Sequence, residues 1–322
     1  MSILVYTESE NGKLKKVAYE VASYAKGIAD LMGTSVTAVT VNAENVEELS
    51  QYGVDKVLKV SSDKLSKFNA DAYAEVITQA AKKEDSKVIV ISQSANAKYM
   101  APLLAVNLEA GYVSNAVKLP ILDEGFNVER TAFTNKAFSM TSISTDIKVL
   151  GLSNNSYGLK ENESSLTQEE FSPELTDENF GITVESVDKN KDKVSIADAE
   201  VVISAGRGMK GPENWGMIEE LAGVLNAATA CSKPVSDMGW RPHGEHVGQT
   251  GKPVATNLYI AIGISGAIQH LAGISASKNK VVINTDPEAP FFKAADYGIV
   301  GDAFEVVPQL IEKLKEFKAN NS

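Results

Sequence analysis

Three glycine-containing segments in the C-terminal half of the chain combine residue types that hold phosphate-bearing ligands. The first, 206–211, reads GRGMKG and follows the apolar run Val201–Ser204. Glycine lets the backbone approach a ligand closely, and an arginine can bind a phosphate through two parallel hydrogen bonds. We therefore expect Arg207 and Gly208 to lie against an anionic ligand.

The spacing of segment 206–211 also fits the GxGxxG pattern of NAD-binding Rossmann domains. That pattern requires a helix that begins at the glycines and an acidic residue about 20 residues further on, at the end of the second strand. Pro212 and Glu213 delay the helix to about Asn214, and no Val/Ile-rich strand ending in Asp or Glu lies near residue 226. NAD binding is therefore the weaker interpretation.

Segment 263–273, GISGAIQHLAG, is the most informative of the three. It follows a buried strand directly and begins a short helix, and the free N–H groups of a helix N-terminus bind anions. Ser265 can cap this helix and also contact a phosphate. Gln269 and His270 follow one turn later beside the same opening. A lone histidine on a helix is usually structural, but this position favours ligand contact.

The remaining segment, 247–251, lies between the other two in the chain and reads VGQTG. Its glycines permit close approach to a ligand, and Gln249 and Thr250 offer both donors and acceptors of hydrogen bonds. A polar turn after Pro242 explains the same residues without a ligand. Taken alone, this segment does not decide between the two interpretations.

Metal binding and nucleophilic catalysis find little support. His243 and His246 are spaced for one helix face, but Pro242 and Gly244 oppose a helix, and no further His or Cys lies nearby for a tetrahedral site. No GxSxG motif occurs, and Ser265 is one residue out of that pattern. We expect neither a metal nor a catalytic triad.

The elements that must position these segments are strands alternating with helices. Over the first 150 residues this alternation predicts a parallel sheet covered on both faces. The strand-like segments are Ile3–Tyr6, Ser35–Val41, Lys56–Val60 and Lys87–Ser92, and the helix-like segments are Lys15–Met32, Asp71–Lys83 and Pro102–Gly111. Four strand-like segments then follow with little helix between them, which predicts an antiparallel extension of the same sheet: Lys118–Leu122, Asn127–Phe133, Phe138–Ile143 and Ile147–Leu150.

A polar stretch, Leu152–Asp177, is predicted to be a loop or linker, and Ile182–Val187 alternates as a strand. A second α/β unit begins near Ser195. Its predicted strands are Val201–Ser204, Tyr259–Ile264, Lys280–Asn284 and Tyr297–Val300, and its predicted helices are Asn214–Leu225 and Phe304–Lys318. The sequence thus predicts two doubly wound α/β domains with parallel sheets, residues 1–194 and 195–322.

Length and composition agree with this plan and exclude several classes of protein. The chain has 322 residues, 43% of them hydrophobic, which suits two domains. Its net charge of −11 argues against nucleic-acid binding.

The single cysteine, Cys231, excludes an internal disulfide, and we expect it to be a small buried hydrophobe in a reducing compartment. No apolar stretch approaches the ~20 residues of a membrane span. A strand at Ile3–Tyr6 instead of a targeting segment predicts a bacterial cytoplasmic protein.

Taken in order, the three segments resemble the alpha subunit of electron-transfer flavoproteins. Asn284–Pro290 (NTDPEAP) and Ala295–Gly298 (ADYG) complete the set, and the resemblance is nearly continuous across Pro253–Gly301. The N-terminal half resembles this family in pattern and length only. The resemblance implies that the C-terminal domain is a flavodoxin-like or Rossmann-like FAD-binding domain.

The resemblance also implies how FAD is held. The cofactor lies extended, with its pyrophosphate and ribityl chain against the turn 265–270. Gln249 and Thr250 approach the flavin ring, and His270 lies near its pyrimidine edge. The residues expected to bind FAD are Arg207, Gly208, Ser232, Lys233, Val247, Gly248, Gln249, Thr250, Gly263, Ser265, Gly266, Ala267, Ile268, Gln269, His270, Asn284, Asp286 and Asp302.

By the same resemblance, the chain is an electron carrier and not an enzyme. Its first domain pairs with a smaller beta subunit that carries AMP. Electrons come from dehydrogenases such as acyl-CoA dehydrogenases, in fatty acid beta-oxidation, and leave to a membrane quinone oxidoreductase. The alternative is an electron-bifurcating relative that uses NADH and holds a second FAD in its beta subunit. A nucleotide-binding regulatory module leaves the three C-terminal segments unexplained.

The chain departs from the family pattern in two places. Lys233 stands where the family often has arginine, directly after Ser232, which affects the tuning of the flavin but not its presence. Lys233 is otherwise a surface residue before Pro234. Segment 240–246 is variable in the family.

Overall fold

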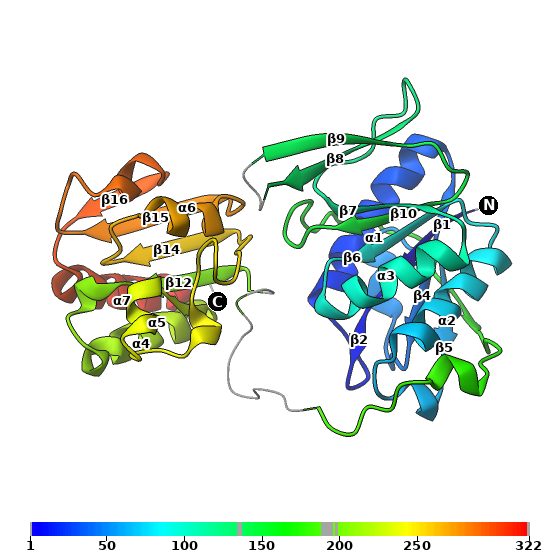
Figure 1. The fold of residues 1–322 in the computed structure, drawn as a ribbon, viewed down its shortest axis with the longest axis horizontal. Coiled ribbons are helices and arrows are strands. Elements are labelled where there is room, and N and C mark those ends of the chain that lie inside the picture. Colours follow the sequence, from blue (N-terminus) through cyan, green and yellow to red (C-terminus); the bar gives the residue numbers. More distant parts are fainter. Residues whose placement is uncertain (1, 134–136, 188–195, 197–198, 321–322) are drawn as a thin grey trace. The chain divides into compact units, whose positions relative to one another are not determined.

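The computed structural model describes residues 2–133, 137–187, 196 and 199–320, and the chain divides into two compact units (Figure 1). The first is built from residues 1–131 and 138–188, and the second from 132–137 and 189–322. Both are α/β units with parallel-rich sheets, as the sequence predicts. The predicted boundary between residues 194 and 195 lies outside the described residues and stays a prediction.

The first unit contains a nine-stranded sheet that is parallel over most of its width. Its order is β11 (Thr167–Glu170), β5 (Lys56–Val60), β4 (Ser35–Val41), β1 (Ser2–Tyr6), β6 (Val88–Ser92), β10 (Lys148–Leu152), β7 (Gly111–Ala116), β8 (Phe126–Ala132) and β9 (Ala137–Ile143). Each pairing from β11 to β7 is parallel, and β8 pairs antiparallel with β7. The antiparallel extension is thus confirmed for β8, whereas β10 returns to the parallel part. A two-stranded hairpin, β2 (Ser9–Glu10) and β3 (Lys13–Leu14), lies apart.

Helices cover both faces of this sheet. On one face α1 (Lys16–Met32) packs against inward side chains such as Ile3 and Val5. On the other face lie α2 (Ala70–Lys83) and α3 (Ala95–Asn107) (Figure 1). They pack against Leu4 and Tyr6. Because successive residues of a strand point to opposite faces, a strand buried on both sides reads as an unbroken apolar run. This is why the apolar run ILVY, residues 3–6, predicts a strand in the interior of the sheet, covered on both faces.

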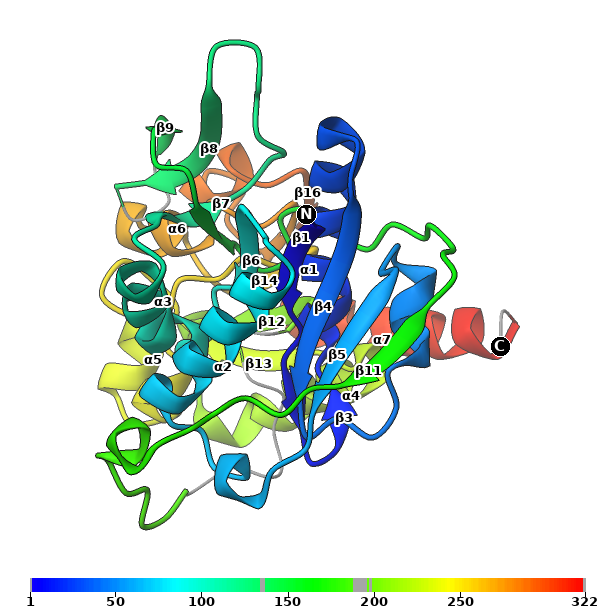
Figure 2. The same cartoon turned by 90° about the vertical axis from the view of Figure 1, so that its right-hand side faces the viewer.

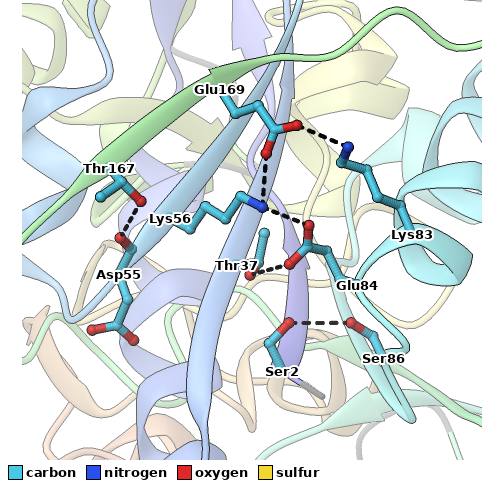
Figure 3. A network of polar contacts seen from close by, with 9 residues as sticks. All are labelled: Ser2, Thr37, Asp55, Lys56, Lys83, Glu84, Ser86, Thr167 and Glu169. Carbon is cyan, nitrogen blue, oxygen red and sulfur yellow. Dashed lines mark hydrogen bonds and ion pairs between the residues drawn. The ribbon is translucent and has the colours of Figure 1, made fainter.

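The predicted linker Leu152–Asp177 is wrong over β11, which is the edge strand of the sheet beside β5 (Figure 2). The sequence of β11, TQEE, is polar, and ion pairs hold it in place (Figure 3). The Glu169 carboxylate lies 2.8 Å from Lys56 Nζ and 2.8 Å from Lys83 Nζ. Lys56 Nζ also lies 2.8 Å from Glu84. These lysine partners lower the pKa of Glu169 to about 2.

Three further predicted elements in this unit differ from the structure. Segment 182–187 forms no strand; its backbone carbonyls instead accept hydrogen bonds from Lys67 Nζ, at 2.7 Å for Val184. Segment 118–122 is irregular, because Pro120 has no N–H to donate to a ladder. The helix predicted over 102–111 begins earlier, at Ala95, and ends at Asn107.

The second unit has a fully parallel five-stranded sheet in the order β13 (Ala228–Cys231), β12 (Val201–Ala205), β14 (Leu258–Ile262), β15 (Asn279–Asn284) and β16 (Tyr297–Val300). One face is covered by α4 (Gly216–Leu225), α5 (Lys233–Asp237) and α7 (Ala303–Asn320). The other face is covered by α6 (Ile268–Ile274) and the loops around it. The sequence predicts neither β13 nor α5.

Cys231 ends β13 and is fully buried in this second core, which confirms its predicted role as a small hydrophobe. Burial raises the pKa of its thiol to about 12, so it is not a reactive thiolate. Among the helices within the described residues, none is long and apolar enough to cross a membrane.

Candidate functional site

The carboxyl edge of the second sheet contains a topological switch point. From β12 the chain passes through α4 to β13 on one side, and it later places β14 on the other side of β12. Loops that leave such a pair of strands run in opposite directions and open a crevice, where α/β folds bind their ligands. The loops that follow β12 and β14 begin with Gly206 and Gly263, so the structure brings the first and the most informative glycine segments together.

Glycines allow these two loops to touch backbone to backbone. A Cβ on Gly206 would lie 2.2 Å from Gly263 O, and one on Gly208 would lie 2.6 Å from Gly263 Cα. The Gly208 N–H donates to Gly263 O at 3.1 Å. Arg207, between the two glycines, is exposed, and within the described part of the chain it forms no ion pair. Its guanidinium is therefore available to an anion.

The turn before α6 differs from the expected capping. The helix begins at Ile268 with Ala267 as its N-cap residue and no side-chain cap, so the prediction that Ser265 caps it is wrong. Ser265 is exposed, and its carbonyl accepts the Phe291 N–H at 3.0 Å. Gly266 has φ +89°, and a Cβ there would lie 2.5 Å from Phe291 N. Gly266 is thus required by the packing of the protein itself.

The loop 247–251 lies beside α6 and the end of β13. Val247 N–H donates to Cys231 O at 3.0 Å, and Gln249 N–H donates to Gln269 O at 2.7 Å. The side chains of Gln249 and Thr250 are exposed at this edge. All three glycine segments therefore converge on one end of the sheet, as a shared ligand requires.

Three predicted site residues on the other side of β14 have protein partners. Asn284 Nδ2 donates to Ile264 O at 3.1 Å, and Asn284 Oδ1 accepts the Asp286 N–H at 3.1 Å. Asp286 Oδ1 in turn accepts the Glu288 N–H at 2.9 Å. Asp302 precedes α7, accepts the Phe304 N–H at 3.0 Å and lies 3.8 Å from Lys210 Nζ. These contacts shape the loops after β15 and β16.

His270 is the buried member of the predicted set, with 5% of its surface exposed. Its Nε2 lies 2.9 Å from the Tyr259 hydroxyl, and its ring lies near that of Phe291, with centroids 6.0 Å apart. Its Nδ1 has no hydrogen-bond partner within the described residues. Burial, and secondarily the nearby His246, lower the pKa of His270 to about 4, so the ring is neutral at neutral pH.

Comparison with known proteins gives a family for both units. Residues 3–175 match the model of the electron transfer flavoprotein domain, and residues 195–275 match that of the electron transfer flavoprotein FAD-binding domain. The chain is 36% identical to the electron transfer flavoprotein subunit alpha of Bacillus subtilis, over 99% of both chains. The alpha subunit of Thermoanaerobacterium thermosaccharolyticum is also 36% identical, over 98% of both. Protein FixB of Clostridium saccharobutylicum is 32% identical, over 98% of this chain and 96% of that protein.

The chain belongs to the electron transfer flavoprotein alpha subunit family. The family's FAD-binding domain includes the loops after β12, β13 and β14, where most of the predicted site residues lie. FAD carries an anionic diphosphate and a flavin ring with hydrogen-bond acceptors. A site that binds it needs cations for the diphosphate and neutral hydrogen-bond donors for the ring. Among the described residues, Arg207 has no ion-pair partner and the Nδ1 of buried His270 has no hydrogen-bond partner, so these two are groups of the required kinds. The residues present fit FAD.

Ser232 and Lys233 follow β13 in this alpha subunit. Ser232 is buried and its N–H donates to Ala205 O at 3.1 Å, which places it next to the β12 loop. Lys233 is the first residue of α5, is exposed, and lies 3.1 Å from Asp237. The structure therefore gives Lys233 a surface partner, and its contact with a flavin stays a prediction.

Sequence reasoning missed the partners that hold His270, namely Tyr259 and Phe291. Both are fully buried, and their rings are stacked with centroids 6.4 Å apart. A signal existed for Tyr259, because a tyrosine in a buried strand requires a partner for its hydroxyl. Within the described residues, no group of three or more His, Cys, Asp or Glu is placed to hold a metal ion.

Proposed function

We propose that this chain is the FAD-carrying subunit of a heterodimeric electron carrier, and that FAD binds at the carboxyl edge of the second sheet. The observation that carries this proposal is the meeting of the glycine loops after β12 and β14 at a switch point, within the family's FAD-binding domain. FAD, when bound, supplies the redox chemistry at its flavin ring. The chain's own residues bind it, orient it and set its surroundings.

Each group at the edge has a role that its position supports. Arg207 is exposed beside the β12 loop and neutralises the diphosphate of the cofactor. Ser265 and the first N–H groups of α6 donate hydrogen bonds to the same part. Gln249 and Thr250 are exposed on a loop that is fixed to α6 through Gln269 O, and they hydrogen-bond the ring.

The direction of electron transfer is proposed from the family. Dehydrogenases such as acyl-CoA dehydrogenases donate electrons to this subunit, and a membrane quinone oxidoreductase accepts them. The chain acts as a carrier and not as an enzyme. It pairs with a beta subunit that holds AMP, and the heterodimer works in the bacterial cytoplasm.

Counting cofactors tests this proposal. The chain is co-expressed with the beta subunit of the same organism, and the cofactors of the purified complex are released by denaturation and identified. One FAD and one AMP for each heterodimer support the proposed carrier. Two FAD for each heterodimer support the bifurcating alternative. A complex without FAD overturns the assignment of the site.

The site assignment has its own test in Arg207. Arg207→Ala removes the exposed cation, and Lys252→Ala, at an exposed lysine of the neighbouring loop, is the matched control. We expect weaker FAD retention during gel filtration for Arg207→Ala than for the control. Equal retention in both variants contradicts the proposed role of Arg207.

A further inference from the structure

A buried aromatic cluster lies beneath α6, made of Tyr259 on β14, His270 on α6 and Phe291 after β15. The side chains of Tyr259 and Phe291 are fully buried, and 5% of His270 is exposed. The three rings lie with centroids 6.0 to 6.4 Å apart. A polar contact joins two of them, because the Tyr259 hydroxyl lies 2.9 Å from His270 Nε2.

The direction of this hydrogen bond follows from burial. A buried hydroxyl must donate its hydrogen, since an unmade hydrogen bond in the interior is costly. Two polar groups lie close to the Tyr259 hydroxyl: the buried Ser204 hydroxyl, which acts on the phenol oxygen as a donor, and His270 Nε2 at 2.9 Å, which is left to accept the phenol's hydrogen. Burial also raises the pKa of Tyr259 well above its usual range, so the phenol keeps its hydrogen. Nε2 therefore accepts.

A neutral imidazole that accepts at one nitrogen carries its hydrogen on the other. The ring is neutral, because burial and the neighbouring His246 lower the pKa of His270 to about 4. Nδ1 is thus an N–H donor. The Val247 backbone lies close enough to favour a proton on the ring, but at a geometry that completes no hydrogen bond with Nδ1. The donor is left for another acceptor.

We propose that Tyr259 is a positioning residue for the flavin site, which holds His270 as the tautomer with its hydrogen on Nδ1. His270 then meets the flavin as a neutral hydrogen-bond donor, and not as an acceptor or a cation. The stacked ring of Phe291 fixes the plane of Tyr259 and so the direction of its hydroxyl. The consequence for the flavin rests on the proposed function, whereas the tautomer does not.

The tautomer is read directly by NMR. The full-length protein, in the complex in which it is purified, is labelled with nitrogen-15 at histidine, and His270→Asn assigns the His270 signals among those of the three histidines. In the unaltered chain we expect a protonated Nδ1 and an unprotonated Nε2. In Tyr259→Phe we expect a mixture of the two tautomers or their exchange. A protonated Nε2 in the unaltered chain overturns the proposal, whether or not FAD is bound.

The effect on the flavin is tested by measuring Tyr259→Phe both alone and combined with His270→Asn. Tyr259→Phe keeps the stacked ring, and we expect it to retain FAD but to shift the reduction potential of the bound flavin. The side-chain amide of asparagine can supply a donor in place of Nδ1 without help from Tyr259. In the His270→Asn background we therefore expect Tyr259→Phe to cause no further shift. Tyr297→Phe, at a 67% exposed tyrosine on β16, is the matched control.

The remaining outcomes separate this inference from the proposed function. An equal shift from Tyr259→Phe in both backgrounds shows that Tyr259 does not act through His270 and overturns the proposal. The proposal is also overturned if Tyr259→Phe changes neither the tautomer of His270 nor the reduction potential of the flavin. If no FAD is found in the unaltered complex, the proposed function fails, and the NMR result still decides the tautomer. If Tyr259→Phe does not fold, the tautomer of the unaltered chain decides.

Discussion

Lys233 is a surface residue whose predicted role is to tune the flavin. It is 57% exposed, and its ammonium lies 3.1 Å from the carboxylate of Asp237, one turn along α5. A lysine is a compact, strongly hydrated charge, whereas arginine is planar and can bond in two places at once. If the flavin lies beside Ser232, the Asp237 carboxylate weakens the positive field that Lys233 exerts on it.

Removing the charge of Lys233 and removing the charge of Asp237 should therefore move the flavin's reduction potential in opposite directions. Lys233→Ala should lower it, because a cation stabilises the extra electron, and Asp237→Asn should raise it. An exposed ion pair contributes at most about 1 kcal/mol, which corresponds to tens of millivolts, since about 59 mV is a tenfold change for one electron. Lys315→Ala, at a lysine paired with Glu220 at 2.7 Å, is the matched control. The same potential in all three variants removes Lys233 from the site.

His270 gives the second unit a pH dependence with a definite sign. Its pKa is about 4 in the folded protein, below the ordinary value of 6.5, so the unfolded chain binds a proton first as the pH falls. The stability that depends on neutral His270 is fully present above pH 6.5 and falls toward pH 4. Since one pKa unit corresponds to about 1.4 kcal/mol, the loss is on the order of 3 kcal/mol.

Both tryptophans, Trp215 and Trp240, belong to the second unit, so their fluorescence follows its unfolding alone. We expect the urea midpoint of the unaltered chain to fall between pH 6.5 and 4 by more than that of His270→Asn. The pKa of His246 is also lowered, by burial first, so the difference between the two proteins isolates His270. Parallel curves for both would contradict the depressed pKa.

At the scale of elements, β11 shows how distant charges decide a strand. Glu169 has a pKa of about 2, below its ordinary 4.5, so its ion pairs are intact above pH 4.5 and are lost as the pH falls through about 2. Glu169→Gln removes both pairs at any pH. We expect faster hydrogen exchange at residues 167–170 in this variant. Glu316→Gln, on α7, breaks an exposed pair with Lys313 and should leave that exchange unchanged. Slow exchange in both variants would show that backbone pairing with β5 suffices.

A second prediction at this scale concerns the turn before α6. Gly266 has φ +89°, and an added Cβ would lie 2.5 Å from the backbone of Phe291, so Gly266→Ala should destabilise the second unit by roughly 1–3 kcal/mol even without FAD. Gly223→Ala is the matched control, because a Cβ added to that helical glycine would meet no atom within 4 Å outside its own helix and chain neighbours. It should stabilise by about 0.5–1 kcal/mol. Equal urea midpoints for the two variants contradict the clash.

The elements that the sequence predicts share strong local periodicity, and those it misses lack it. Apolar runs such as VVIS and KVIVIS identify strands that are buried on both faces. β13, with the sequence ATAC, has few β-branched side chains and is held by pairing with β12, which no local pattern shows. The polar β11 depends on Lys56 and Lys83, far away in sequence. The glycine segments predict where the site lies, but the contacts of Gly206, Gly208 and Gly266 come from packing.

At the scale of the whole molecule, the chain leaves large apolar side chains uncovered. Phe133 is 82% exposed, and Tyr99 and Val106, both on α3, are 74% and 76% exposed. In the second unit Ile268 is 79% exposed at the first position of α6. Single exposed hydrophobic residues are ordinary, but Tyr99 and Val106 lie two turns apart on α3 and so share one face of it, which favours a protein partner. The exposed apolar side chains and the membership of a subunit family both indicate a protein partner.

We therefore predict that the chain depends on its beta subunit both for solubility and for FAD. One subunit provides only part of the surroundings of a flavin, and an exposed cofactor edge binds weakly because water competes for the same donors. Expressed alone, the chain should be poorly soluble or should lose FAD during gel filtration, whereas the co-expressed pair should elute as one yellow complex. The flavin absorbance for each mole of alpha subunit measures the difference. A stable, fully flavinylated monomer at micromolar concentration would show that the second unit holds FAD without help, and that the uncovered apolar side chains serve another contact.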